Sequence, residues 1–515
     1  MPARPPRVWT PAVAMICSLV LLISAAGARG QELDRELTVL LGRAGLGNAG
    51  VGVSIVDVAT GRELASHRAD ERMIPASNLK LLTSGAAVAV LGPTYEFRTQ
   101  IERHGDKLVI RGAGDPAFAD PILLEQMGVT LDAFMDRLVE SVTRVGMTRC
   151  DEIIVDDRVF DRTYIHPDWP RDQLDKGYCA EVSGLNFHAN VLRIFASPGA
   201  RNDEPATVTT EPSGAGIEVR SRARTLRGKN RSTAIGAVRA ADQNLFTISG
   251  TVNGALDVPA ETTLHEPSMV FARLLAERLL RAGVGAGSGA SPCRLVGAEE
   301  TLPQADTVLA VVRTPLSVVL ERCNRDSENF YAESLLKLMG HIATRQPGTW
   351  ASGTSIVRLQ VRDRVGPEGA AMLFLSDGSG MSRVNKITAR VMTRWLASFA
   401  QDDVNGPAFI ESIPRARAEG TMRRRFRDKE PVNEVRGKSG LLNGVRTLSG
   451  YVTDTGSGRR VAYSILVNDI PPKVTAAAVK DFHEDVVMIA DRWLARQPGA
   501  SVEERLGGGE SRPRK

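Results

Sequence analysis

Two residues near the start of the sequence have the types and spacing of a nucleophile and its base. Ser77 and Lys80 stand three positions apart, where a loop leads into the apolar run 81–91. On a helix, positions i and i+3 share a face, so the amine would lie beside the hydroxyl at the positive end of the helix dipole. A serine hydroxyl needs an adjacent base, and a partly desolvated lysine whose pKa is lowered by neighbouring positive charge can provide it. The pair predicts acyl transfer through a serine ester.

This pair alone is a weak signal, because a chain of this composition holds about one S-x-x-K match by chance. Two motifs follow it in the sequence, Ser327-Glu-Asn329 and Lys438-Ser-Gly440. Taken singly, the first is typical of a helix start capped by Ser327, and the second of a turn. In this order, with the last motif before a predicted hairpin, the set resembles that of penicillin-recognising serine enzymes.

Further segments resemble one family, the D-alanyl-D-alanine carboxypeptidase/endopeptidases of the class C, low-molecular-mass penicillin-binding proteins. The resemblance covers nearly the whole chain after its first 30 residues. The segments are Pro75-Ala-Ser-Asn-Leu-Lys-Leu-Leu-Thr83, Gly112-Ala-Gly-Asp-Pro116, Asp377-Gly-Ser-Gly-Met-Ser-Arg383 with Asn385, and Glu419-Gly-Thr-Met422. The long gap between the first and second catalytic motifs also resembles this family, whose insertion forms two accessory domains.

The resemblance implies a role for each motif residue. Ser77 would attack the carbonyl of the penultimate D-alanine, and Lys80 would take its proton. Ser327 and Lys438 would relay that proton to the departing amine, while Asn329 would hold either the substrate amide or the Lys80 side chain. Water would then hydrolyse the acyl-enzyme, and β-lactams would trap it. No cofactor and no metal ion are expected.

The same resemblance implies substrate-binding residues. Lys438 and Ser439 would bind the terminal carboxylate, beside Gly440, and Arg383 is a candidate partner for an anionic stem-peptide side chain. A surface ion pair is the alternative for Arg383. Ser439 replaces the family's commoner threonine and keeps the hydroxyl. Leu441 replaces a threonine or serine, so a side-chain contact to substrate is lost, but its backbone N–H can still serve the oxyanion hole with that of the nucleophile.

The sequence predicts an α/β (α+β) protein: a transpeptidase domain of the penicillin-binding/serine β-lactamase type, with an antiparallel sheet, helices and a large insertion. We expect a split catalytic domain at 32–94 and 303–497, and an accessory region at 95–302 with a β-rich module near 190–255. Amphipathic and alternating patterns locate its elements. They are helices at 34–43, 81–91, 131–145, 269–282 and 473–496, strands at 108–111 and 152–156, and hairpins at 51–67 and 448–467.

The N-terminal segment has the features of a cleavable export signal. Arg4 and Arg7 precede the short apolar run 13–26, and the small residues 26–28 suit a signal peptidase. We therefore expect residues 1–28 to be removed and the enzyme to lie in the periplasm or otherwise outside the cytoplasm. The Gly-, Arg- and Lys-rich end, residues 498–515, is expected to be disordered.

The cysteines beyond the signal are Cys150, Cys179, Cys293 and Cys323. In an oxidising compartment they could form one disulfide or none, and three pairings are open. No HExxH-like or zinc-ligand spacing occurs, so a metal enzyme is not expected.

Two other functions fit parts of the sequence. A β-lactamase or esterase could use the same catalytic domain, although the long insertion disfavours a dedicated β-lactamase. A non-catalytic wall-binding scaffold would lack one of the motif residues, yet all are present. The net charge of +5 and the basic run 423–427 could meet an anionic polymer or membrane surface, but a solvated helix face is the simpler interpretation. Nucleic-acid binding has no motif support. The sequence leaves open the oligomeric state and the choice between carboxypeptidase and endopeptidase action.

Overall fold

A computed structural model describes residues 32–229 and 231–497, which form two compact units. The first unit takes the described parts of Met1–Pro75, Lys386–Asp403 and Ile413–Lys515. The second takes Ala76–Asn385 and Val404–Ser412. The predicted signal peptide and C-terminal tail lie outside the described residues.

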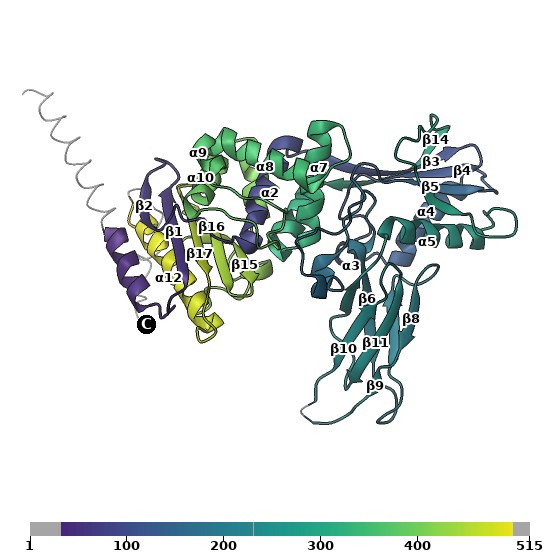
Figure 1. The fold of residues 1–515 in the computed structure, drawn as a ribbon, viewed down its shortest axis with the longest axis horizontal. Helices are drawn as coiled ribbons and strands as arrows, with labels where there is room; N and C mark the ends of the chain where they lie inside the picture. The colour runs from purple at the N-terminus through teal and green to yellow at the C-terminus, as the bar shows by residue number, and fades with distance from the viewer. Residues whose placement is uncertain (1–31, 230, 498–515) are drawn as a thin grey trace, which may run out of the picture. The chain divides into compact units, whose positions relative to one another are not determined.

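The first unit is built on an antiparallel sheet, seen in Figure 1, with the strand order β15-β16-β17-β1-β2. Its strands are β1 (Gly50–Asp57), β2 (Glu63–His67), β15 (Glu434–Leu442), β16 (Val445–Thr453) and β17 (Arg460–Asn468). Both predicted hairpins are therefore confirmed. β15 is an edge strand, because its neighbour on one side is β16 and the sheet ends there.

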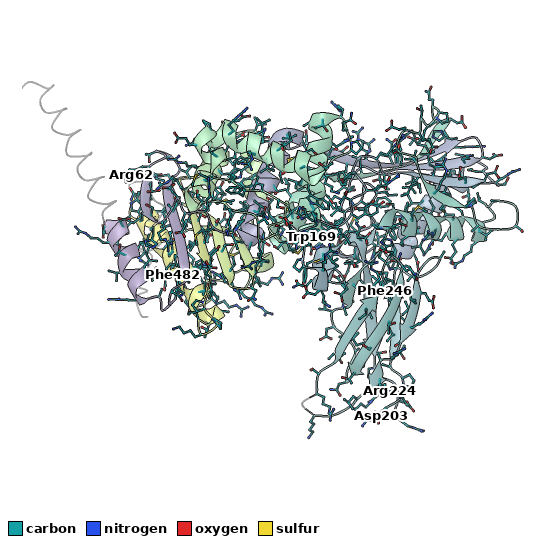
Figure 2. The ribbon with its side chains drawn as sticks, viewed as in Figure 1. Arg62, Trp169, Asp203, Arg224, Phe246 and Phe482 are labelled. Carbon is teal, nitrogen blue, oxygen red and sulfur yellow. The ribbon has the colours of Figure 1, made fainter. Side chains whose placement is uncertain are left out.

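Helices cover both faces of this sheet. Ser54 on β1 meets Thr393 of α10 (Ala389–Ala400), with 2.8 Å between their hydroxyl oxygens. The neighbouring Val53 and Ile55 belong instead to a buried cluster shared with α12 (Ala476–Ala495). Successive side chains of a strand point to opposite faces, so α10 and α12 lie on opposite faces. Phe482, labelled in Figure 2, is one of the α12 residues in that cluster.

The helical part of the second unit carries the start of the predicted catalytic region. Its helices are η1 (Ala76–Asn78), α2 (Leu79–Leu91), α6 (Leu316–Glu321), α7 (Asn329–Thr344), α8 (Trp350–Val365), α9 (Pro367–Ala371) and α11 (Gly406–Ser412), with a π-helical turn, η5 (Arg322–Asp326). Every residue of α2 from Leu79 to Val88 is buried. A helix buried on all sides is rigid, which makes α2 a firm base for a side chain near its start.

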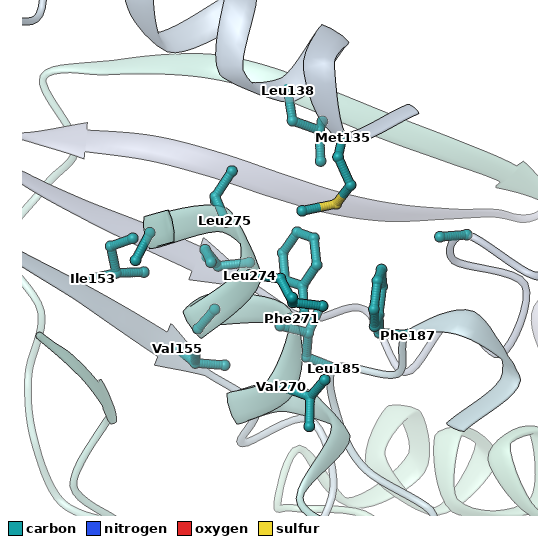
Figure 3. Packing of buried hydrophobic residues seen from close by; sticks show 14 of the residues in the cluster. Met135, Leu138, Ile153, Val155, Leu185, Phe187, Val270, Phe271, Leu274 and Leu275 are labelled. Atoms are coloured by element: carbon teal, nitrogen blue, oxygen red, sulfur yellow. The ribbon is translucent and has the colours of Figure 1, made fainter. Parts of the chain in front are cut away.

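A mixed sheet in the same unit has the order β13-β5-β4-β3-β14. Its strands are β3 (Glu96–His104), β4 (Lys107–Arg111), β5 (Glu152–Asp156), β13 (Cys293–Leu295) and β14 (Thr307–Pro315). Against it pack α4 (Leu131–Thr143) and α5 (Pro267–Arg281), following the short α3 (Pro121–Gln126). Figure 3 shows Phe271 of α5 among Met135, Leu275 and Phe187 in the core between them.

The stretch near 190–255, where the sequence predicts a β-rich module, contains many strands. It holds a sheet of β8 (Glu218–Ser221), β9 (Arg224–Thr225), β10 (Ala234–Arg239) and β11 (Leu245–Val252), and a second sheet of β6 (Val191–Ser197), β7 (Thr207–Glu211) and β12 (Ala260–Thr263). Phe246 of β11, labelled in Figure 2, is fully buried. At the other end of the module, the Arg224 guanidinium donates to the Asp203 carbonyl, 2.7 Å away.

The structure also bears on the basic run, on the cysteines and on membrane-spanning helices. Residues 423–428 form turns and not a helix, so the predicted basic helix face is wrong; Arg425 within it is largely buried and pairs with Glu484 at 3.0 Å. The four cysteines within residues 32–229 and 231–497 form no disulfide. Within residues 32–229 and 231–497, no helix combines the length and the apolar content needed to cross a bilayer.

Candidate active site

Ser77 lies in a tight 3₁₀ turn, η1, directly before α2, as the sequence predicts. The residue before it, Ala76, has the left-handed backbone conformation (φ 45°) that non-glycine residues rarely adopt. A Cβ on Gly380 would lie 1.9 Å from the Ala76 carbonyl oxygen, so the loop holding Gly380 packs directly on this turn. Strained backbone held by close packing is typical of catalytic turns. The turn leaves Ser77 partly exposed while its neighbours are buried.

Lys80, one turn along α2, is completely buried. Its Nζ lies 3.0 Å from Ser77 Oγ, 2.7 Å from Asn329 Oδ1 and 3.1 Å from the Ser379 carbonyl oxygen. Burial lowers the pKa of Lys80, because the charged ammonium is poorly solvated there. The sequence interpretation attributed the lowered pKa also to neighbouring positive charge, and that part is wrong. The charges around Lys80 are acidic and act in the opposite direction.

Asn329 is the first residue of α7. Of the two roles that the family resemblance leaves open, the structure places its Oδ1 on Lys80. Its Nδ2 donates to the Tyr178 carbonyl oxygen at 3.0 Å. The amide is therefore held at both ends, so its oxygen stays directed at the amine.

Ser327 stands between η5 and α7 and has the left-handed conformation (φ 69°). It does not cap α7, whose N-cap residue is Glu328, so the capping alternative is wrong. Arg322 holds the π-helical turn before it, through Asp326 at 2.5 Å and the buried Asp120 at 3.0 Å. Single π-turns are frequent at functional sites, and this one sets the direction in which Ser327 leaves the helix.

The segment 377–385 folds around the Asp377 carboxylate. That carboxylate accepts from the backbone N–H groups of Gly380 (2.9 Å) and Ser382 (2.6 Å), from Asn385 Nδ2 (2.8 Å) and from Trp169 Nε1 (3.2 Å). Trp169, labelled in Figure 2, comes from the predicted accessory region. Arg383 in this loop has an exposed side chain.

The third motif lies on β15, in the first unit. Lys438 is fully buried, and its amine donates to the Ser439 carbonyl at 3.1 Å. The Gly437 N–H donates to Pro414 at 3.0 Å, away from β16. Backbone N–H groups two and four residues further along a strand point the same way, so those of Ser439 and Leu441 face the outer edge of the sheet. The Leu441 side chain is 63% exposed.

The predicted site residues thus form two groups. Within the second unit, the structure brings Ser77, Lys80 and Asn329 into hydrogen-bond contact, while Arg383 stays at the surface. Within the first unit, residues 438–441 are consecutive on one edge strand. In the described part of the chain, no three His, Cys, Asp or Glu side chains are grouped to hold a metal ion. The sequence interpretation missed the Ser379 carbonyl, because a backbone acceptor carries no residue-type signal.

Comparisons with known proteins identify the family of this chain. The sequence model of the D-Ala-D-Ala carboxypeptidase 3 (S13) family matches residues 33–493. The D-alanyl-D-alanine carboxypeptidase of Actinomadura sp. (strain R39) is 31% identical over 472 residues, which cover 87% of this chain and 83% of that protein. A carboxypeptidase of Mycobacterium tuberculosis is 25% identical, covering 92% and 86%.

The fold also matches a solved structure. The crystal structure of penicillin binding protein 4 (dacB) from Haemophilus influenzae superimposes with a TM-score of 0.69 at 19% identity, covering 89% of this chain and 98% of that one. The match confirms the predicted transpeptidase fold with additional domains. The chain belongs to the D-Ala-D-Ala carboxypeptidase 3 (S13) family, and it is a serine-type D-Ala-D-Ala carboxypeptidase.

Proposed function

We propose that the chain is an exported enzyme that cleaves the stem peptides of peptidoglycan beside a D-alanine, through an acyl-enzyme on Ser77 that β-lactams trap. The observation that carries this proposal is the buried Lys80 amine, 3.0 Å from Ser77 Oγ and with a lowered pKa. A lysine that is neutral in a larger fraction of molecules can accept the serine proton, which a surface lysine cannot do near neutral pH.

The first step moves one proton and forms one bond. The Ser77 hydroxyl proton passes to Lys80 Nζ while Ser77 Oγ bonds to the carbonyl carbon of the penultimate D-alanine. The C–N bond to the terminal D-alanine then breaks, and a proton relayed through Ser327 and Lys438 completes the leaving amine. Water hydrolyses the ester and regenerates the serine. The two stages account for release of D-alanine and then of the shortened peptide.

Two features of β15 support the proposal that the substrate peptide binds along this strand. An edge strand can pair with an extended peptide, and the outward N–H groups of β15 end at Leu441. We propose that the N–H groups of Leu441 and Ser77 hold the oxyanion, and that Lys438 and Ser439, beside Gly440, bind the terminal carboxylate. Arg383, on its exposed loop, would meet an anionic stem-peptide side chain.

The hydrogen bonds of Lys80 also support the split domain. They join a residue of the segment 32–94 to Asn329 and Ser379, both from 303–497. We propose that these segments form the catalytic domain and that 95–302 is the accessory region. A β-lactam complex of the Haemophilus influenzae relative supports inhibition by this class of compound.

Digestion of purified peptidoglycan, with the products identified by mass spectrometry, tests the proposal. D-Alanine released from pentapeptide stems would establish carboxypeptidase action, and separation of cross-linked stems would establish endopeptidase action. An enzyme that yields neither product but rapidly turns over penicillin would be a β-lactamase, and the proposal would be wrong.

Replacing Leu441 with proline tests the oxyanion hole. Proline removes the N–H without breaking a bond to β16, because that N–H faces the outer edge, where proline is tolerated. We expect the acylation rate to fall by about 10²-fold, the usual effect of losing one oxyanion donor. Leu441→Thr, which keeps the N–H and restores the family's common side chain, is the control and should acylate at least as fast as the wild type. Equal rates for the proline and threonine variants would contradict this assignment.

A further inference from the structure

Another buried acid, Glu333, lies one helical turn beyond Asn329 on α7. Its side chain is fully buried, and its two oxygens accept three N–H bonds. Oε1 accepts from the Ser379 N–H (2.8 Å), while Oε2 accepts from the Gly378 N–H (2.8 Å) and from Trp350 Nε1 (2.9 Å). One carboxylate thus holds two successive backbone amides of the loop.

Ser379, whose N–H is held in this way, also carries the carbonyl that accepts from Lys80 at 3.1 Å. The same stretch is fixed from α2, where Thr83 Oγ1 donates to the Gly378 carbonyl at 2.7 Å. Two helices therefore determine where the Ser379 oxygen lies. The position of that oxygen matters because the two N–H groups of a neutral Lys80 amine each need an acceptor.

An ammonium group has three N–H donors, and Lys80 has three acceptors around it: Ser77, Asn329 and Ser379. The neutral amine has two N–H donors and one lone pair. If the two N–H groups donate to Asn329 and Ser379, the lone pair is left facing the Ser77 hydroxyl. Both acceptors are required, because an amine held by only one of them can rotate its lone pair away from the serine.

We propose that Glu333 is a positioning residue for acylation: its carboxylate fixes the Ser379 carbonyl against Lys80, so that the lone pair of the amine faces Ser77. This inference rests on the proposed function, in which Lys80 is the base. Glu333 itself touches neither the reacting serine nor, in this account, the substrate. It acts through the loop.

The charge of Glu333 gives the proposal a second, independent readout above about pH 7, because burial, and after it the charge of Asp377, raise the pKa of Glu333 to about 7. The titratable groups whose charges act on Lys80 are Cys323, Glu333, Asp377 and Glu328, and each of them raises its pKa against the larger effect of burial. Removing the Glu333 charge therefore lowers the pKa of Lys80 further. Because acylation needs the neutral amine, the acylation rate rises with pH through the pKa of Lys80. In a Glu333→Gln variant, this rising limb of the pH–rate profile must move to lower pH.

The test measures acylation of the full-length enzyme by a fluorescent penicillin, with the rate constant separated from the non-covalent binding constant. Glu333→Gln has nearly the same shape but can no longer accept at both oxygens. We expect its acylation rate constant to fall by about 10- to 100-fold, part of the effect of a misplaced general base. Penicillin binding and the final labelled fraction should stay unchanged, and the rising limb should move to lower pH.

Gly378→Ala reaches the same contact from the loop side. Its Cβ would lie 2.9 Å from the Ala332 carbonyl oxygen and 3.0 Å from Leu336 Cβ, so the loop must move away from α7. We expect the same loss of rate with Glu333 and its charge intact, and therefore without the shift of the limb. This variant decides the matter if Glu333→Gln fails to fold.

Two control variants change features that the inference does not use. Trp350→Phe removes the third N–H bond to the carboxylate but leaves both bonds to the loop, and Gly236→Ala adds a Cβ into open space. Both should acylate at nearly the wild-type rate. A folded Glu333→Gln variant with the wild-type rate and pH limb would overturn the inference, and so would an equal loss in Trp350→Phe.

Labelling of Ser77→Ala distinguishes a failure of the proposed function from a failure of the role proposed for Glu333. If Ser77→Ala is still labelled, the proposed function fails and this inference falls with it. If that variant is silent while Glu333→Gln and Gly378→Ala both acylate normally, only the role of Glu333 is wrong.

Discussion

Replacing Ser77 with alanine is expected to abolish covalent labelling by penicillin and to lower the release of D-alanine to background. The variant lacks the only atom proposed to form the acyl bond, and acyl transfer without that bond has no covalent intermediate. The fold should be unaffected, because Ser77 is partly exposed and alanine is a good residue for a helix start inside this turn. Gel fluorescence and a coupled D-alanine assay measure the two effects.

Ser84→Ala is the matched control for this experiment. Ser84 lies on α2, seven residues beyond Ser77, and its buried hydroxyl bonds to Asn324. Its loss should cost about 1 kcal/mol of stability, the usual net value of one buried hydrogen bond, while labelling continues. Persistent labelling of Ser77→Ala would remove the nucleophile assignment.

Replacing Lys80 with methionine is expected to lower the acylation rate by about 10³-fold or more, the upper part of the range for loss of a general base. Methionine keeps the length of the side chain and cannot accept the serine proton. Penicillin should still bind non-covalently, so the effect appears in the rate constant and not in the binding constant. In the wild-type enzyme, the rate should rise with pH through the lowered pKa of Lys80, and this rise should be absent from the variant.

Lys337→Met is the control, because Lys337 on α7 is also a fully buried lysine. Its amine donates to Asp161 at 2.6 Å and lies 3.8 Å above the Trp350 ring. Methionine leaves the Asp161 carboxylate without this partner, which should lower the melting temperature but not the acylation rate of the folded protein. A Lys80→Met variant as fast as Lys337→Met would contradict the assignment of the base.

Local patterns predicted much of the fold. The hairpins, the helix after Ser77 and the β-rich module follow from period-2 and helical alternation and from turn residues, which act over a few positions. The order of the three motifs indicates which side chains could carry the chemistry, and their roles stay a prediction. The contact of Ser77 with Lys80 follows from their local spacing, whereas the contact of Lys80 with Asn329 joins distant segments and was indicated only by the order of the motifs.

What the sequence did not predict depends on contacts between distant segments. The left-handed conformation of Ser327 is imposed by the π-turn and its ion pairs, although the residue type suits a helix cap. The low pKa of Lys80 comes from complete burial, and burial depends on packing by α7 and the loop at 377–385. The Ser379 carbonyl and Glu333 illustrate the same point. The Ser379 carbonyl is a backbone group and Glu333 is an acid within a helix, so neither has a sequence signal. Only the fold places them near the Lys80 amine.

The central claim is that Ser77 forms the acyl bond, and peptide mapping of the penicillin-treated enzyme tests it most directly. After brief exposure to penicillin and proteolysis, mass spectrometry of the peptides locates the adduct on a single side chain. We expect one penicilloyl group, on Ser77 in the peptide that contains residues 75–80. An adduct on Ser327, Ser439 or any other residue, or an intact protein that carries none, would contradict it.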